Sequence, residues 1–365
     1  MTKARTNASA SPAVGRNMII NGAMNVSQRA TTTGTGGVGG TTAHYPTLDR
    51  WQILAGSTAG RATMSQTADG PNGISANCIK LDCTTADADI ASAEYFIIEH
   101  NLEGQNLQRI GKGVAGAKQV TVSFYVKASA SFTFALEVHQ SQHGRSCNKL
   151  FDVTTDWNRI ELTFPADVDD GSSPIVDDNA VGIKLFFWLH AGATWSSGTL
   201  QSGSFVNSVS ANRAAGIDSF FSNTANNFFI TGVQMEVGPV ATEFEQEDIS
   251  TTLAKCQRYF HQIQGNGSAT TALATGFASS ATVARAYIKF PVTMRSAPTL
   301  SGSSGITASD LNSYTIASSG VAIANADKTG TFLNTTVSGG LTVLRVNASQ
   351  LSASTGSFIA FTAEL

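Results

Sequence analysis

The chain has 365 residues, a formal net charge of −3, only 13% charged residues and 34 glycines. This length exceeds that of most single domains, so we expect two. Few charges with many small and β-branched residues are typical of a β-rich extracellular or virion surface and argue against a helical enzyme. The net charge also argues against a nucleic-acid-binding protein, which presents a basic stripe. Because no apolar run reaches about 18 residues, we expect no membrane insertion.

The cysteines and the N-terminus indicate a reduced, unsecreted protein. Four cysteines are too few for a disulfide framework in a chain of this size: Cys78, Cys83, Cys147 and Cys256. We expect buried free thiols, with a Cys78–Cys83 disulfide as the alternative. Their spacing is not that of a zinc site, and we expect no metal ligands and no cofactor. The opening MTKARTNASASPAVG lacks the apolar core of a signal peptide.

Residues 1–15 are small and polar without an apolar period, which predicts a flexible arm that is either disordered or lies on a neighbouring subunit. We expect a first strand-like segment over Asn17–Val26 and a flexible glycine-rich loop over Thr31–Thr42. Trp51, between alternating apolar residues, is predicted to be in the core. Leu102–Ile110 has the spacing of a short helical turn.

Four segments alternate strictly between apolar and polar residues and predict strands with one buried face each: 120–127, 132–139, 159–164 and 183–190. Repeated alternation with long irregular loops is typical of a β-sandwich, here a jelly roll. Each large apolar side chain buried between the sheets contributes about 1.5–3 kcal/mol.

The opposite faces of these strands carry the candidate functional residues. If the strands are neighbours, one surface combines aromatic rings with polar groups, as a sugar-binding surface does, and a loop residue adds a second platform: Tyr125, Glu137, His139, Lys184, Trp188, His190 and Trp195. The alternative, favoured by the frequency of aromatic residues at protein interfaces, is that Phe186 and Trp188 pack under a loop or against another subunit.

The sequence also bears on metal binding and on catalysis. The acidic loop at residues 167–178 (Asp167, Asp169, Asp170, Asp177 and Asp178) is either a solvated loop or a calcium site, although its spacing is not that of a helix–loop–helix site. No nucleophile elbow, HExxH helix or paired carboxylates can be picked out, so we expect no catalytic residues and no enzyme.

A strand ending at Gly238-Pro239 is followed by a helical pattern. Phe229, Val233, Met235 and Val237 are expected on one side of that strand. The helix carries an apolar stripe that either packs on its own sandwich or joins copies of the chain as an oligomer interface: Ile249, Leu253, Cys256, Phe260 and Ile263.

After Gly265, about 100 residues with many short alternating segments predict a small β-sandwich, among them 314–316, 321–323, 341–346 and 358–361. Its faces hold little beyond small polar residues, so we expect copies of the chain to cover its apolar edge. The predicted fold is thus all-β: an arm over residues 1–15, a jelly-roll sandwich over 16–247, a linking helix over 248–264 and a C-terminal β-sandwich over 265–365.

Four strings carry a family resemblance: RNMIINGAMNVSQR (16–29), LDRWQI (48–53), ITGVQMEVGPVATEFE (230–245) and LAKCQRYF (253–260). Together they are similar to the ends of a domain common in tail-fibre and other structural proteins of tailed bacteriophages, which resembles a carbohydrate-binding-module jelly roll. Met235 stands where leucine is usual and Glu243 where proline is usual. Residues 273–292 and Pro298–Leu300 resemble C-terminal modules of phage fibres.

The resemblance implies a non-enzymatic virion protein, a tail fibre or a head or tail decoration fibre, that assembles in the host cytoplasm and is released by lysis. Expected partners are the chain itself, as a homotrimer, other virion proteins and a host cell-surface glycan, without nucleic acid. A structural capsid decoration or connector without glycan binding is the alternative, and a tailspike depolymerase is a further one. Head or tail location, the glycan and the outward-facing end stay open.

Overall fold

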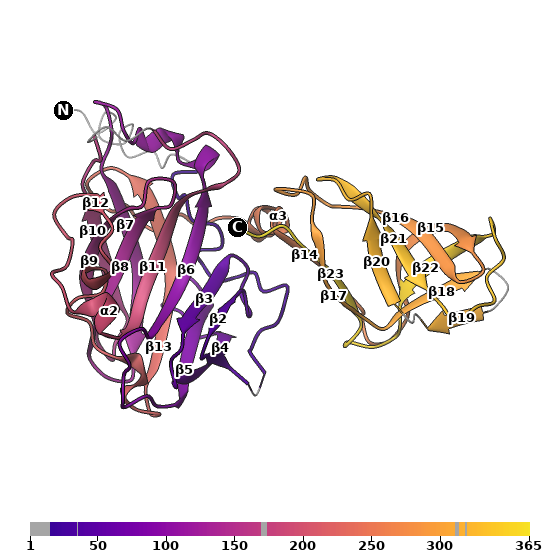
Figure 1. The fold of residues 1–365 in the computed structure, drawn as a ribbon, viewed down its shortest axis with the longest axis horizontal. Coiled ribbons are helices and arrows are strands. Elements are labelled where there is room, and N and C mark those ends of the chain that lie inside the picture. Colours follow the sequence, from indigo (N-terminus) through magenta and orange to yellow (C-terminus); the bar gives the residue numbers. More distant parts are fainter. Residues whose placement is uncertain (1–14, 35, 169–173, 311–313, 318–319) are drawn as a thin grey trace. The chain divides into compact units, whose positions relative to one another are not determined.

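The computed structural model describes residues 15–34, 36–168, 174–310, 314–317 and 320–365, so the predicted arm lies, apart from Gly15, outside the described residues. The chain divides into two compact units, Met1–Ile249 and Ser250–Leu365. Both are built from antiparallel strands, and the few helices are short (Figure 1). The predicted all-β fold class is confirmed.

The first unit is a sandwich of two sheets. Sheet 1 has the order β1-β4-β5-β13-β7-β10, and sheet 2 has the order β12-β9-β8-β11-β6-β3-β2. The strands of sheet 1 are β1 (Val38–Gly39), β4 (Arg61–Thr67), β5 (Cys78–Thr85), β7 (Val120–Ala128), β10 (Asn158–Phe164) and β13 (Asn227–Val237). Those of sheet 2 are β2 (Thr42–His44), β3 (Trp51–Gly56), β6 (Tyr95–Glu103), β8 (Phe132–Gln140), β9 (Arg145–Val153), β11 (Val181–Ala191) and β12 (Val206–Asn207).

Short helical segments connect some of these strands. They are η1 (Gly104–Asn106), η2 (Gln108–Ile110), α2 (Ala193–Ser196), η3 (Ser210–Asn212) and η4 (Phe220–Ser222). The predicted helical turn over Leu102–Ile110 is therefore present in its second half as η1 and η2, after the end of β6.

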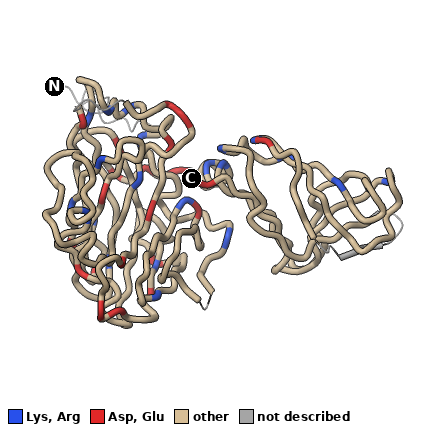
Figure 2. The backbone as a smooth tube through the Cα atoms, in the orientation of Figure 1, with Lys and Arg blue, Asp and Glu red and all other residues tan. Residues whose placement is uncertain are grey.

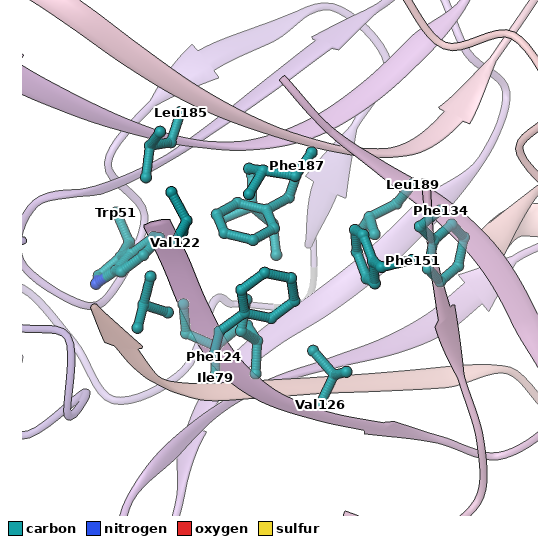
Figure 3. Close-up of a cluster of buried hydrophobic side chains, with 14 of the residues drawn as sticks. Trp51, Ile79, Val122, Phe124, Val126, Phe134, Phe151, Leu185, Phe187 and Leu189 are labelled. Atoms are coloured by element: carbon teal, nitrogen blue, oxygen red, sulfur yellow. The ribbon is translucent and has the colours of Figure 1, made fainter. Parts of the chain in front are cut away.

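The inner faces of the two sheets enclose one aromatic and aliphatic core (Figure 3). Phe124 of sheet 1 lies edge-on to Phe187 and Phe151 of sheet 2, with ring centroids 5.2 and 5.1 Å apart. Trp51 is fully buried and its ring lies 6.3 Å from that of Phe187. The predicted inward faces of β7, β8 and β11 and the core position of Trp51 are confirmed.

A bulge in β13 changes the predicted faces of that strand. Thr231 pairs with Tyr125 and Gln234 with Ser123, so between these two pairs β13 advances by three residues and β7 by two. The extra residue reverses the alternation. Val233 and Met235 therefore face the core as predicted, whereas Phe229 lies on the outer face, and its placement with them was wrong.

The segment from Asn17 to Val26 was predicted as a strand and forms turns instead. The side chain of Asn21 explains this, because its amide donates to the carbonyls of Val26 (2.8 Å) and Asp49 (2.9 Å) and its carbonyl accepts from the backbone of Val26 (3.0 Å). The backbone carbonyl of Asn21 accepts from the Trp51 indole (3.1 Å). Such side-chain bonds to the backbone compete with a strand ladder. A Cβ at Gly22 would approach the Val233 carbonyl oxygen to 2.1 Å, so the turn requires glycine there.

These contacts bring three of the four family-like strings together. The backbone of Met18 donates to the Met235 carbonyl (2.9 Å), and the Glu245 carboxylate accepts from the backbone of Asn17 (2.8 Å). The first string thus lies against the last strand of the sandwich, and its Asn21 is hydrogen-bonded to Asp49 and Trp51 of LDRWQI. The fourth string, LAKCQRYF, lies in the second unit.

In its described residues, the second unit contains two sheets and one helix. Sheet 3 has three strands in the order β14-β23-β17. Sheet 4 has seven strands in the order β19-β18-β22-β15-β16-β21-β20. The elements are α3 (Ile249–Gln257), β14 (Phe260–Gln264), β15 (Thr271–Ser280), β16 (Val283–Lys289), β17 (Thr299–Ser304), β18 (Ile306–Asp310), β19 (Tyr314–Ala317), β20 (Gly320–Ala324), β21 (Gly330–Thr336), β22 (Val346–Leu351) and β23 (Phe358–Thr362).

The helix predicted over 248–264 ends at Gln257, and its last residues are a strand instead. Phe260 and Ile263 belong to β14, which pairs with β23. Cys256 and Phe260 are buried, and Ile263 packs on the core of the second unit. The predicted interface stripe is therefore wrong as one helix face, since only Ile249 of its members is exposed.

All four cysteines are free and buried, and the predicted thiol state is confirmed. In the described part of the chain, every helix is too short and too polar to cross a membrane.

Candidate functional site

The seven predicted surface residues do not form one surface. Tyr125 lies on β7 in sheet 1 and Trp195 on α2, whereas the strands of the other five, β8 and β11, pair with each other in sheet 2. Glu137, Trp188 and His190 are at most 1% exposed. The prediction assumed that all four alternating segments are neighbours, and the division of the sandwich into two sheets separates them.

Two rows of polar side chains nevertheless cross the outer face of sheet 2. One row runs across β3, β6, β11 and β8 through the cross-strand partners Gln52–Glu99, Glu99–Phe186 and Phe186–Glu137, and Phe186 is its one aromatic member. The next row follows Asn101–Lys184 and Lys184–His139. We call Gln52, Glu99, Asn101, His139 and Lys184 the polar strip. Three of them, Gln52, His139 and Lys184, are partly exposed.

Beside the polar strip, the aromatic residues form a cluster beneath the segment that follows β11. Trp188 lies 5.8 Å from Trp195, 6.5 Å from Phe186 and 6.3 Å from Tyr95, measured between ring centroids. Ala214, from the same covering segment, is buried against them. The aromatic cluster, as we call Tyr95, Phe186, Trp188 and Trp195, therefore packs under a loop, which is the alternative that aromatic composition favoured.

An ion pair holds the covering segment over the aromatic cluster. Arg213 Nε donates to both carboxylate oxygens of Glu137 at 3.0 Å, and the Trp188 indole donates to the same carboxylate at 2.8 Å. The Arg213 guanidinium also lies over the rings of Trp188 (4.9 Å) and Trp195 (5.6 Å). Cation–π contacts of this kind contribute about 0.5–2 kcal/mol each.

The charge of Glu137 is stabilised despite complete burial. Burial raises the pKa of this carboxyl. The hydrogen bond from His139 and the positive charge of Arg213 lower the pKa by a larger amount, so it lies below its ordinary value. The carboxylate is therefore ionised at neutral pH and anchors both Arg213 and Trp188.

The polar strip contains hydrogen-bonding capacity that its neighbours leave unused. Lys184 Nζ donates to Glu99 Oε1 at 2.8 Å, whereas Glu99 Oε2 is buried and has no partner. The amide of Asn101 donates to Tyr45 Oη (3.3 Å), whereas Asn101 Oδ1 has no partner. Buried acceptors without partners are uncommon and call for an explanation such as a ligand or an ordered water.

Sequence reasoning missed three central residues of this site. Glu99 and Asn101 lie on β6, which begins with the apolar run YFII and continues with three consecutive polar residues, so alternation gave no signal for them. Arg213 lies in an irregular loop about 76 residues from Glu137, and only the fold brings the two together. Trp195, predicted as a second platform, is half-buried, and its indole donates to the Ala93 carbonyl at 3.1 Å.

The acidic loop is described only in part, since Asp169 and Asp170 lie outside the described residues. Asp167 accepts from Arg145 (3.1 Å) and from the Gln140 amide (2.9 Å). Asp178 accepts from the backbone of Ala180 at 3.0 Å. These two carboxylates already have partners within the protein. Elsewhere, basic and acidic residues are interspersed along the described chain (Figure 2).

No protein-family model matches the chain, and no curated protein matches it. Among solved structures, it is similar to a putative sugar-binding protein from Bacteroides thetaiotaomicron, with 11% identity, coverage of 61% of this chain and 100% of that one, and a TM-score of 0.33. It is also similar to a CBM4 module, with 14% identity, coverage of 60% and 99%, and a TM-score of 0.31. A family 11 carbohydrate-binding module from Clostridium thermocellum has 12% identity, coverage of 53% and 91%, and a TM-score of 0.28. At these values the similarities assign no ligand to this chain.

Proposed function

We propose that the chain is a non-enzymatic structural subunit of a tailed-phage particle and that its first unit binds a carbohydrate at the polar strip. The four family-like strings support the virion assignment, and three of them, at residues 16–29, 48–53 and 230–245, are hydrogen-bonded to one another in the first unit. The all-β architecture with few charges agrees with this assignment. A tail or decoration fibre that attaches to the host surface is the form of this function that we favour.

The observation that carries the carbohydrate proposal is the pair of unused acceptors, Glu99 Oε2 and Asn101 Oδ1, beside partly exposed donors. Sugar hydroxyls accept from the partly exposed Lys184 Nζ and Gln52 amide, and an ordered water links them to the buried acceptors Glu99 Oε2 and Asn101 Oδ1. Hydrogen bonds to a charged group contribute about 1.5–3 kcal/mol.

A glycan array probed with the full chain tests the carbohydrate proposal. Glu99→Gln and Lys184→Ala should each weaken binding at least tenfold, the factor that corresponds to about 1.4 kcal/mol. Lys80→Ala is the matched control, because the side chains of Lys80 and Lys184 are both 29% exposed and both pair with a carboxylate, Lys80 on the other sheet. Absence of binding to host-surface glycans, or equal loss in the control, contradicts the proposal.

Electron cryo-microscopy of intact particles labelled with an antibody against the chain tests the virion assignment. A fixed site on the particle without glycan binding would support the alternative of a structural decoration or connector. Release of reducing sugar from host polysaccharide would support a depolymerase and overturn the non-enzymatic assignment.

Self-association is proposed from the outer face of sheet 4 in the second unit. Phe277, Tyr287 and Val346 are 42%, 45% and 48% exposed, and Phe277 pairs directly with Val346. Tyr287 stacks edge-on to Phe332, with ring centroids 5.4 Å apart. An exposed apolar patch on a sheet is typical of an interface, and we propose that three copies of the chain cover it.

Light scattering of the purified chain at micromolar concentration should give the mass of a trimer. The double substitution Phe277→Ser/Tyr287→Ser should shift the mass toward the monomer, whereas Val240→Ser, at an exposed valine of the first unit, should not. A sharp monomer for the unmodified chain contradicts the proposal.

A further inference from the structure

Three buried titratable side chains meet at the end of β11 without contacting the polar strip. Asp87 and Glu94 lie in the connection between β5 and β6, and His190 lies near the end of β11. His190 Nε2 is 3.8 Å from Glu94 Oε2 and 4.0 Å from Asp87 Oδ2. One ligand atom of each residue lies within 4.8 Å of the others. All three side chains are almost completely buried.

Hydrogen bonds from neighbouring groups fix the two carboxylates, whereas one ring nitrogen of His190 has none. Asp87 Oδ2 accepts from Thr58 Oγ1 (2.6 Å) and from the backbone of Ala59 (2.9 Å). Glu94 Oε2 accepts from the backbone of Ala91 at 2.9 Å. His190 Nε2 is buried and has no partner.

Neither tautomer of His190 satisfies Nε2. Its Nδ1 lies 2.8 Å from Ser219 Oγ, which orients the ring. If Nδ1 carries the proton, the lone pair of Nε2 faces two carboxylates. If Nε2 carries it, the nearest carboxylate oxygen, at 3.8 Å, is too far for a hydrogen bond. A group that accepts electron pairs from all three residues satisfies Nε2, and a metal ion is such a group.

We propose that Asp87, Glu94 and His190 bind one divalent transition-metal ion, with zinc the best fit. Two carboxylate oxygens and one imidazole nitrogen supply three of the four ligands of a tetrahedral zinc ion, and water supplies the fourth. The imidazole disfavours calcium and magnesium, which take oxygen ligands. With the ion on Nε2, Nδ1 carries the proton and donates to Ser219 Oγ, which is the outer-shell contact that orients a metal-binding histidine.

The ion would fasten a loop that supports the aromatic cluster. The Ala93 carbonyl accepts from the Trp195 indole (3.1 Å), and the Glu94 carbonyl accepts from the backbone of Gly192 (2.8 Å). Glu94 itself is followed directly by Tyr95. A metal ion at Glu94 therefore joins this loop to β11 and fixes the segment that carries Trp195.

The test uses the full chain without a histidine tag, stripped of metal with a chelator. Calorimetric titration with zinc chloride should give one site per chain, and saturating zinc, at about 100 times Kd, should raise the Tm of the first unit by about 5 °C or more. Calcium and magnesium chloride should give no such rise. Cobalt(II) as a spectroscopic substitute should give the visible absorption of a tetrahedral site.

Glu94→Gln keeps the shape of the ligand and removes its charge, so zinc affinity should fall at least tenfold. His139→Gln is the matched control, because His139 also lies beside a carboxylate, 3.5 Å from Glu137, on the same sheet. If Glu94→Gln does not fold, Glu94→Asp, which keeps the charge and shortens the side chain, replaces it. The proposal is overturned if the unmodified chain takes up no zinc, if the Glu94 variant binds zinc as tightly as the unmodified chain, or if His139→Gln abolishes zinc binding.

Discussion

Replacing Glu137 by glutamine removes one negative charge from the centre of the aromatic cluster and keeps the shape of the side chain. The carboxylate is fully buried and holds Arg213 at 3.0 Å and the Trp188 indole at 2.8 Å. Breaking a fully buried ion pair costs about 3–5 kcal/mol. Because the Arg213 side chain is 17% exposed, water replaces part of the lost interaction. We therefore expect the free energy of unfolding of the first unit to fall by about 2–3 kcal/mol.

Urea unfolding followed by tryptophan fluorescence measures this loss selectively, since all four tryptophans lie in the first unit. The corresponding decrease in Tm is about 4–12 °C. Glu161→Gln is the control, because Glu161 is 46% exposed and pairs with Arg159 at 2.9 Å, so that its loss should cost less than about 1 kcal/mol. Equal effects of the two substitutions would refute the assignment of Glu137 as the anchor of the covering segment.

The same carboxylate gives a pH dependence with a defined sign. The folded-state pKa of Glu137 lies below its ordinary value of 4.5, through the hydrogen bond from His139 and the charge of Arg213, which outweigh burial. Its contribution to stability is therefore complete above pH 4.5 and is lost as the pH falls through the lower folded-state pKa. The difference in unfolding free energy between the unmodified chain and Glu137→Gln should decrease below pH 4.5.

Two further predictions concern buried titratable groups. Burial lowers the pKa of His261 from 6.5 to about 4, so the second unit should lose about 3 kcal/mol of stability between pH 6.5 and 4, and His261→Gln should flatten this dependence in scanning calorimetry. Burial raises the pKa of Cys147 to about 11, and all four thiols are buried. A disulfide reagent at pH 8 should therefore label none of them in the folded chain and all four after denaturation, and rapid labelling of the folded chain would show that a thiol is accessible.

The sequence predicted the inner faces of the sandwich well because the alternation of a strand has a strict period of two. Val122, Phe124 and Phe187 face the core as their pattern indicated. The prediction was wrong where one residue interrupts the period, as at the β13 bulge, which places Phe229 on the outer face. The prediction was also wrong at Phe260. Apolar residues three or four apart are expected on one face of a helix, but in this chain a short strand begins at Phe260 and buries it.

The candidate site was predicted less well because its partners come together only in three dimensions. Alternation indicated correctly that Lys184 and His139 leave the core, but it does not say which strands are neighbours, and Tyr125 lies on the other sheet. The cluster around His190 had no signal at all, since its carboxylates are about 100 residues away and follow no metal-binding spacing. Long-range pairing therefore limits what a single sequence predicts about this site.

The arrangement of charges on sheet 2 argues that its outer face fixes the position of loops and adds little to the stability of the fold. The core between the sheets already buries the large apolar side chains. An ionised Glu137 in the apolar surroundings of Trp188 adds little net stability, because desolvation offsets most of its attraction to Arg213. What the pair does determine is the register of the covering segment, since only one placement of Arg213 satisfies both carboxylate oxygens. The same reasoning applies to Asp87, Glu94 and His190, because burying them together is costly unless an ion binds between them. The Glu137–Arg213 pair and the proposed metal site therefore both hold Trp195 in place beside the polar strip.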